Sequence, residues 1–162
     1  MAADAVRLMV LATAAHLEPA TGYAVRKHLL DQGADRWGGV SVASIYSVLR
    51  TLTRHGHLEE LDDPTGVRKA TKAYRLTASG REELRAVWRR AIETVDAAHP
   101  LAFHVAITLT ELVPHAEYVD ALRSRLTTLD RLAELPLPDL PAARLWRALG
   151  AAERAWLREM VP

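Results

Sequence analysis

The fold of this 162-residue chain is decided by the stretch SVASIYSVLRTLTR, residues 41–54. Ser41 is a residue type that caps helix N-termini and Gly56 is a type that ends helices, so the stretch predicts a helix over about 42–55. One face of this helix is apolar and consists of Val42, Ile45, Val48, Leu49 and Leu52. The opposite face carries Ala43, Ser47, Arg50 and Arg54. Such a helix can pack on a core with one face and enter the major groove of DNA with the other.

Two helices are predicted upstream of this segment. Apolar residues recur at helical spacing over residues 5–17. Thr21 can cap a second helix that runs to about Gln32. The segments 18–20 and 35–40 are expected to be a break and a loop, because proline and glycine interrupt them. The helix over 42–55 is therefore predicted to be the third of three.

A β-hairpin is predicted directly after these helices. Residues 57–61 and 72–76 are expected to be its two strands, and Pro64-Thr65-Gly66 marks the turn between them. The stretch 64–76 contains no acidic residue and four basic ones, Arg68, Lys69, Lys72 and Arg75. Three helices followed by a basic hairpin are the element order of a winged helix-turn-helix, whose wing contacts the DNA backbone.

The C-terminal half is predicted to be helical, over about 78–97, 101–112, 115–135 and 141–160. The proline-rich segment 135–141 is expected to be an extended linker. We therefore expect a mainly α protein with a small two-stranded β wing. Residues 1–80 would form the winged helix-turn-helix DNA-binding domain, and residues 81–162 a helical dimerisation and regulatory region.

The last two predicted helices carry apolar stripes that are too large to stay in water. The helix over 115–135 has apolar residues at spacings of three and four, as in a short coiled-coil seam. The last helix has a stripe that we predict to be the dimer interface, formed by Leu145, Leu149, Ala152, Trp156 and Met160. The two stripes could instead pack on each other within one subunit. We favour a mixed arrangement, in which some faces pack internally and the last helix pairs with a second subunit.

Composition argues against several classes of protein. The chain has no cysteine, which excludes disulfides, thiolate zinc sites and cysteine nucleophiles. The seven histidines show no metal-ligand spacing, and we find no phosphate-binding glycine loop or nucleophile elbow, so no metal, cofactor or enzymatic activity is expected.

With a net charge of +1, any basic surface must be local. No apolar run approaches the roughly 18–20 residues that span a bilayer and no export signal is evident, so we expect a cytoplasmic protein. The abundance of Arg, Ala and Leu is typical of GC-rich bacterial genomes.

Several motifs resemble those of the PadR-like transcriptional regulators. Residues 21–25, TGYAV, are similar to the HGYEL start of that family's second helix. Residues 41–49, SVASIYSVL, resemble its S-x-G-S-I-Y-P-x-L segment. Residues 54–59, 72–80 and 152–157 are similar to its xxGLIE, KxYxLTxxG and xxExxWL motifs. Together these motifs extend over about the first 80 residues, and a further one lies in the last predicted helix.

The resemblance implies a homodimeric repressor that binds double-stranded operator DNA. It assigns DNA contacts to Tyr23, Ser41, Ser44, Tyr46, Arg68 and Lys69. The polar helix face and the basic wing add Ala43, Ser47, Arg50 and Lys72. Tyr46 could also pack under the wing, and Tyr23 could lie partly in the core. The family usually has His, Gly and Pro at the positions of Thr21, Ala43 and Ser47, so this chain is expected to read a different operator.

The resemblance also implies release from DNA by a small aromatic or drug-like effector that binds near the dimer interface. Trp88 and Trp156 are candidate walls of an effector pocket, or else anchors of the core and the interface. One alternative is a MarR-type regulator, which places a dimerisation helix before the DNA-binding helices, whereas here the first helix begins within about five residues. The other alternative is a winged-helix protein-interaction module that does not bind DNA.

Overall fold

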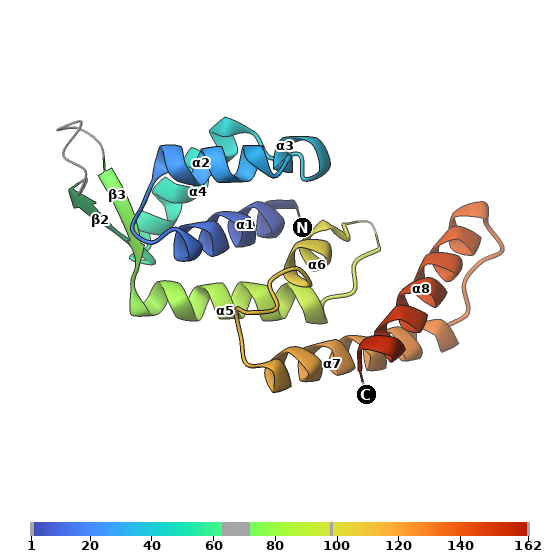
Figure 1. Cartoon of the computed structure of the whole chain (residues 1–162). Helices are drawn as coiled ribbons and strands as arrows, with labels where there is room; N and C mark the ends of the chain where they lie inside the picture. The colour runs from blue at the N-terminus through green and yellow to red at the C-terminus, as the bar shows by residue number, and fades with distance from the viewer. Residues whose placement is uncertain (1, 63–71, 98, 162) are drawn as a thin grey trace.

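The computed structural model describes residues 2–62, 72–97 and 99–161 of the chain. The elements in chain order are α1 (Ala2–His16), β1 (Ala20–Thr21), α2 (Gly22–Asp31), α3 (Ala34–Trp37), α4 (Val42–Arg54), β2 (Leu58–Asp62), β3 (Lys72–Leu76), α5 (Ala78–Glu93), α6 (Leu101–Ala106), α7 (His115–Glu134) and α8 (Pro141–Met160) (Figure 1). The predicted winged helix-turn-helix is confirmed, with α4 in the place of the recognition helix and the β2–β3 hairpin after it. The helical C-terminal half is also confirmed.

Polar side chains define where three of the helices begin. Thr21 Oγ1 and Thr77 Oγ1 each accept a hydrogen bond from the backbone N–H three residues further on, at 3.1 and 3.0 Å. Ser41 and Ser44 form a reciprocal capping box, in which each hydroxyl accepts from the other residue's backbone N–H at 3.0 Å. The predicted starts of α2, α4 and α5 are therefore confirmed.

The sheet is antiparallel, with the strand order β1–β3–β2. The predicted hairpin is confirmed, and its register pairs Leu58 with Leu76 and Asp62 with Lys72. β1 is a third strand that the sequence did not predict, because it lies where we expected only a break, and it pairs Ala20 with Tyr74. Two residues are too few to show the alternating pattern that identifies strands. β1 ties the start of α2 to the wing.

α3 overlaps the segment 35–40, which the sequence predicted to be a loop. Its start follows Gly33, whose φ of +73° is a conformation that side chains with a Cβ rarely adopt. Its end is marked by Gly38, whose N–H donates to the Ala34 carbonyl at 2.9 Å. A helix of four residues is shorter than the period over which an apolar stripe can be recognised.

α5 and α6 both end earlier than predicted, before residues 97 and 112. At the end of α5 the carbonyls of Ile92 and Thr94 accept hydrogen bonds from Arg125 of α7, at 2.8 and 2.7 Å. After α6 the Ile107 carbonyl accepts from the Tyr118 hydroxyl, also from α7, at 3.1 Å. Side chains from a distant helix thus satisfy carbonyls at or just beyond both helix ends, which local sequence patterns do not reveal.

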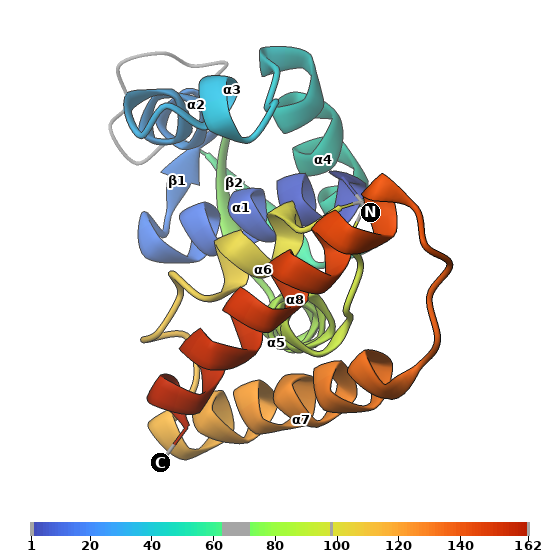
Figure 2. The same ribbon diagram turned by 90° about the vertical axis from the view of Figure 1, so that its right-hand side faces the viewer.

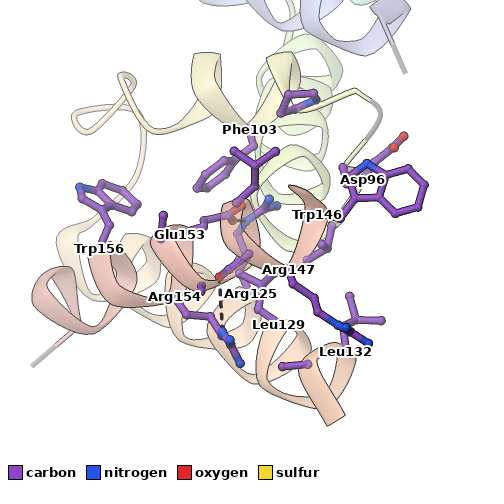
Figure 3. Close-up of a pocket in the computed structure, with 18 of the residues that line it drawn as sticks. Asp96, Phe103, Arg125, Leu129, Leu132, Trp146, Arg147, Glu153, Arg154 and Trp156 are labelled. Atoms are coloured by element: carbon purple, nitrogen blue, oxygen red, sulfur yellow. Dashed lines mark hydrogen bonds and ion pairs between the residues drawn. The ribbon is translucent and has the colours of Figure 1, made fainter. Parts of the chain in front are cut away.

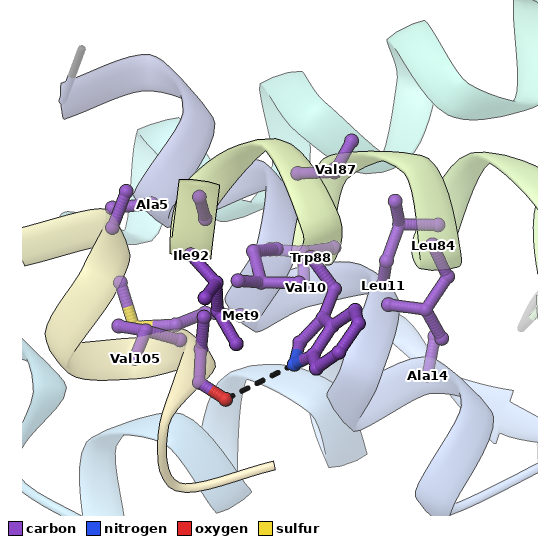
Figure 4. Close-up of a cluster of buried hydrophobic side chains, with 14 of the residues drawn as sticks. Ala5, Met9, Val10, Leu11, Ala14, Leu84, Val87, Trp88, Ile92 and Val105 are labelled. Carbon is purple, nitrogen blue, oxygen red and sulfur yellow. Dashed lines mark hydrogen bonds between the residues drawn. The ribbon is translucent and has the colours of Figure 1, made fainter. Parts of the chain in front are cut away.

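Trp88 of α5 lies in the middle of the core. Its side chain is fully buried, and its indole N–H donates to the Ala106 carbonyl at 3.1 Å (Figure 4). The buried side chains of Val10, Leu11 and Ala14 in α1 belong to the same cluster. α1 also contacts α4, so one helix supports both α5 and the recognition helix. A continuous core therefore joins the winged helix to the helices that follow it.

α8 packs against α7, and its N-terminal end extends away from the rest of the molecule (Figures 1 and 2). Leu157 near its C-terminus is fully buried, and Trp156 packs edge-on against Phe103 of α6 with ring centroids 6.2 Å apart. The segment 135–140 that joins α7 to α8 is exposed along its whole length and contains no helix or strand, as its prolines predict.

The first turn of α5 is pressed against the turn between α4 and β2. The Thr77 N–H donates to the His57 carbonyl at 3.1 Å, and the Thr77 hydroxyl donates to the Gly56 carbonyl at 2.7 Å. A Cβ on Gly80 would lie 1.9 Å from the His57 carbonyl oxygen. Only glycine permits this approach, so the direction of α5 relative to the wing is fixed at this contact.

Gly80→Ala is expected to lower the free energy of unfolding by about 3 kcal/mol, because the methyl group overpacks a contact between two backbone segments. The measurement is urea unfolding followed by tryptophan fluorescence. Gly150→Ala in α8 is the matched control, since its Cβ would meet no atom within 4 Å. The control is expected to stabilise the protein by up to about 1 kcal/mol through helix propensity alone. Equal stability of the Gly80→Ala and parent proteins would contradict the assignment.

Candidate nucleic-acid interface

α4 presents the two faces that the sequence predicts. Ile45, Leu49 and Leu52 are fully buried, and the opposite face exposes Ala43, Ser47, Arg50 and Arg54. Val42 was assigned to the apolar face by its helical spacing, but it lies in the first turn and is 39% exposed. The outer face thus begins with small side chains and ends with two arginines. That order lets the N-terminal part of the helix come close to a surface while the arginines reach outward.

The capping box limits which hydrogen bonds its two serines can form with DNA. Ser44 Oγ accepts from the Ser41 N–H and donates its own proton to the Ser41 carbonyl at 2.7 Å. Ser41 Oγ accepts from the Ser44 N–H and keeps its proton available. A phosphate oxygen can only accept hydrogen bonds, so Ser41 can bind one without loss, whereas Ser44 must first give up a bond within the helix.

The two tyrosines predicted to contact DNA differ in exposure. Tyr23 at the start of α2 is 60% exposed and does not lie in the core. Tyr46 is half-buried, and its ring lies so close to Gly22 that a Cβ there would be 2.8 Å from Tyr46 Cε1. The ring therefore packs α4 against the start of α2. Tyr46 also adds to the rise in the pKa of Tyr74 of β3.

A polar cluster forms where α4 meets the wing. Burial raises the pKa of the Tyr74 phenol above its ordinary value, the carboxylate of Glu60 adds to the rise, and the guanidinium of Arg50 opposes it. These influences place Arg50 within electrostatic reach of the wing. The Tyr74 phenol is consequently protonated at neutral pH and can act as a hydrogen-bond donor.

The described part of the wing holds its basic residues in ion pairs. Lys72 Nζ lies 2.9 Å from Asp62, and Arg75 Nε lies 2.6 Å from Glu59. The hydrogen bond from Lys72 lowers the pKa of the Asp62 carboxyl, so the pair stays charged. The positive charge of Lys72, which is predicted to contact DNA, is thus already neutralised by Asp62 in the free protein. The predicted contacts Arg68 and Lys69 lie outside the described residues.

The helix-turn-helix carries arginines that no carboxylate of the described residues neutralises. Within residues 2–62, 72–97 and 99–161, no Asp or Glu forms an ion pair with Arg26, Arg36, Arg50 or Arg54. The buried Nε of Arg26 also has no hydrogen-bond partner. The same part of the molecule has unpaired acids only at Asp35 and Glu60 among the residues described, so a positive surplus remains. By contrast, most arginines of α5, α7 and α8 are paired, as in Arg81–Glu18, Arg85–Glu117 and Arg158–Asp130.

Sequence reasoning did not select Arg26, Arg36 or Arg54 as site residues. Pairing depends on acids that are distant along the chain; the bond between Arg81 and Glu18, for example, spans 63 positions. No local pattern distinguishes a paired arginine from an unpaired one. The positive surface becomes evident only when the tertiary structure shows which charges are matched.

The predicted dimer interface is largely exposed. Leu145 and Leu149 are 58% and 55% exposed, and Ala152 and Met160 are exposed as well. Trp156 is half-buried by Phe103. Further exposed apolar side chains lie nearby in the chain, at Leu132, Leu135, Leu137, Leu140 and Trp146. This concentration of apolar surface is larger than scattered surface leucines would produce.

A cavity of about 800 Å³ opens between α8 and the helices α6 and α7 (Figure 3). Its walls are mainly apolar and include Phe103, Leu129, Trp146 and Trp156. The two tryptophans predicted as pocket walls are thus separated. Trp156 lines this cavity, whereas Trp88 lies in the core and does not reach it. No three His, Asp or Glu side chains gather as metal ligands in the described part of the chain.

Comparison with known proteins identifies the N-terminal part of the chain. Residues 10–86 match the family model described as the transcriptional regulator PadR-like family. No curated protein matches the sequence. The described helices include none that is long and apolar enough to cross a membrane. The matched segment contains α2, α4 and the wing, together with the unpaired arginines described above, and the resemblance in the sequence motifs is confirmed. Over residues 10–86, which include the winged helix, the chain is similar to the PadR-like family of transcriptional regulators.

Proposed function

We propose that the protein is a homodimeric repressor that binds an operator through α4 and the wing and is released by an apolar aromatic effector. The observation that carries DNA binding is the set of unpaired arginines on the helix-turn-helix, since unmatched positive charge at a groove-sized helix is the electrostatic footprint of a DNA-binding surface. In this proposal residues 1–80 read DNA, and residues 81–162 form the dimer and its regulatory site.

Reading of the operator is assigned to the exposed face of α4. Ala43 and Ser47 are small, so the helix backbone can approach the base edges closely. An alanine methyl can contact a thymine methyl, and a serine hydroxyl can bond to several base edges. Arg50 is exposed and long enough to reach a guanine or a phosphate. Tyr23, Ser41 and Tyr46 would contact the phosphates beside this face.

Dimerisation is assigned to the exposed stripe of α8. One winged helix makes few base contacts, and two-fold dimers obtain affinity and specificity by reading two half-sites. The leucines of the stripe are exposed in the single subunit, so a second copy that covers them gains the free energy of apolar burial. The C-terminal half of α8 is anchored to the same subunit by Leu157, whereas Leu145 and Leu149 remain more than half exposed, Leu149 at the edge of the cavity between α8 and the body.

Effector control is assigned to the cavity beneath α8. Its aromatic walls at Phe103, Trp146 and Trp156 suit a planar apolar molecule. A ligand acts as a switch only if it binds two states of the dimer unequally. A molecule in this cavity contacts both α8 and the body of the subunit, so its affinity depends on how α8 is placed. Repression requires no more than occupancy of a promoter by the ligand-free dimer.

Arg50→Ala is expected to weaken binding to an operator fragment by at least about fivefold, since an arginine contact to a base or phosphate contributes about 1–3 kcal/mol. The fragment is taken from the promoter region next to the protein's own gene or from a selection of genomic DNA, and binding is measured by gel shift at several salt concentrations. Arg123→Ala is the matched control, because Arg123 of α7 is already paired with Asp120. Equal losses in the two variants would refute the assignment, and no shift on any genomic fragment would favour a protein-interaction module.

Leu149→Asp is expected to convert the dimer into a monomer at micromolar concentration, because the interface would have to bury an unpaired carboxylate at a cost of several kcal/mol. Sedimentation velocity measures the change. Ser124→Asp adds the same charge at an exposed position of α7 and should leave the dimer intact. A Leu149→Asp protein that sediments like the parent would show that α8 does not form the interface.

Gly150→Leu is expected to reduce binding to the cavity at least about fivefold, because the new side chain occupies ligand space. Gly150 lines the cavity, and a Cβ there meets nothing within 4 Å, so the fold tolerates the change. The probe is the fluorescent dye 1-anilinonaphthalene-8-sulfonate, which has apolar aromatic rings and one sulfonate; it is titrated by fluorescence and tested for release of the operator fragment. Gly150→Ala is the control and should behave like the parent. Dye that binds equally to both variants would place the ligand site elsewhere.

A further inference from the structure

Arg125 is a buried cation that touches three helices besides its own. It belongs to α7 and is 2% exposed. Its Nη1 donates to the carbonyls of Ile92 and Thr94 at the end of α5, and its Nε donates to the carboxylate of Glu153 in α8. Its guanidinium carbon lies 3.6 Å from the centre of the Phe103 ring of α6. Figure 3 shows Arg125 and Glu153 beside this ring.

These bonds join α8 directly to the end of α5. A buried cation needs a matching anion, and in the described part of the chain Glu153 is the carboxylate paired with Arg125. The carbonyls at the end of α5 lack partners within the helix and carry the negative end of its dipole, which also favours a cation there. Arg125 is thereby held on both sides, by the end of α5 and by α8.

α5 connects this junction to the DNA-binding face. It has 16 residues and is therefore about 24 Å long. At its other end Gly80 lies against the His57 carbonyl, and Arg81 is paired with Glu18, whose carboxylate also accepts from the Leu76 N–H of β3. A packed helix bends little, so the contacts that fix α5 at the wing also determine where its other end, beside Arg125, lies.

We propose that Arg125, through Glu153, is the positioning residue that sets the direction of α8 relative to α5 and thereby the separation of the two recognition helices in the dimer. The inference rests on the proposed dimer through α8. In a two-fold dimer built on α8, any rotation of α8 against α5 displaces both copies of α4, and the fixed spacing of half-sites on DNA requires that separation to be constant.

The other contacts between α8 and the body are of a different kind. Leu157 and the Trp156–Phe103 contact hold the C-terminal half of α8 by apolar packing, which keeps the helix attached. Asp130 of α7 pairs with Arg158 at 2.8 Å and with Arg154 at 3.8 Å, but all three side chains are partly exposed. Exposed pairs contribute little to geometry, whereas Arg125 is buried and is bound at once by Glu153 and by two carbonyls at the end of α5, which specifies one arrangement.

The test measures the distance between the two recognition helices directly. The chain has no cysteine, so Ser47→Cys on the exposed face of α4 provides one nitroxide label per subunit. Pulsed dipolar spectroscopy on the free dimer then gives the distribution of the distance between the two labels. The distribution is compared among the labelled parent and its Glu153→Ala, Glu153→Gln and Asp130→Asn variants. Asp130→Asn is the matched control, since it removes a carboxylate between α7 and α8 at the surface.

Glu153→Ala is expected to widen the distribution at least about twofold, because the ion pair that ties α8 to the buried guanidinium of Arg125 is lost. Glu153→Gln keeps an oxygen that can accept from Arg125 and should restore most of the parent width, and Asp130→Asn should match the parent. A Glu153→Ala dimer with the parent's distribution would overturn the proposal, and so would equal widening by Asp130→Asn or dissociation of the Glu153→Ala dimer. A labelled parent without any dipolar signal between subunits would instead refute the dimer itself.

Discussion

Burial of the Trp88 indole between α1 and α6 is the interaction on which the rest of the structure depends. The indole fills the space where α5 crosses α1, and its N–H is satisfied by the Ala106 carbonyl, so a large polar-tipped side chain is buried without an unpaired donor. α1 in turn supports α4 on its other side. The recognition helix and the C-terminal helices are therefore held by one scaffold, and neither half is packed independently of the other.

The distribution of charge follows from this scaffold. Where helices pack on one another in the C-terminal half, most arginines lie beside carboxylates from neighbouring turns or helices. On the helix-turn-helix Arg36, Arg50 and Arg54 are exposed and Arg26 is half-buried, and none of the four has an anionic partner among the residues described. A protein with a net charge of +1 thus acquires a local positive surface by pairing its charges elsewhere.

The helices and the wing could be predicted from the sequence because their signals are local. Thr21, Ser41 and Thr77 cap helices with their own side chains, and the apolar face of α4 follows from the spacing of its residues. β1 and α3 are too short for any periodic signal. The early end of α5 is set by Arg125, which is more than 30 positions away along the chain. Such long-range hydrogen bonds leave no trace in a local pattern.

The candidate site was predictable to the same extent. The exposed faces of α4 and α8 follow from helical spacing, but the burial and the hydrogen-bond partners of individual side chains do not. Sequence patterns do not distinguish Trp88 from Trp156, whereas in the structure Trp88 is buried in the core and Trp156 lies beside a cavity. The hydroxyl of Ser44 is committed to its own helix, and the ring of Tyr46 supports α2 through contact with Gly22. These differences depend on neighbours that only the tertiary structure provides.

Selection of genomic DNA fragments by the purified protein tests the central claim most directly. A dimeric winged-helix regulator should enrich fragments that share a two-fold repeated sequence, with half-site centres about one helical turn or a multiple of it apart. Its affinity for those fragments should fall steeply as salt concentration rises, because the unpaired arginines displace counterions from phosphates. Recovery of fragments without any common sequence, or of no fragments above the input, would contradict the account.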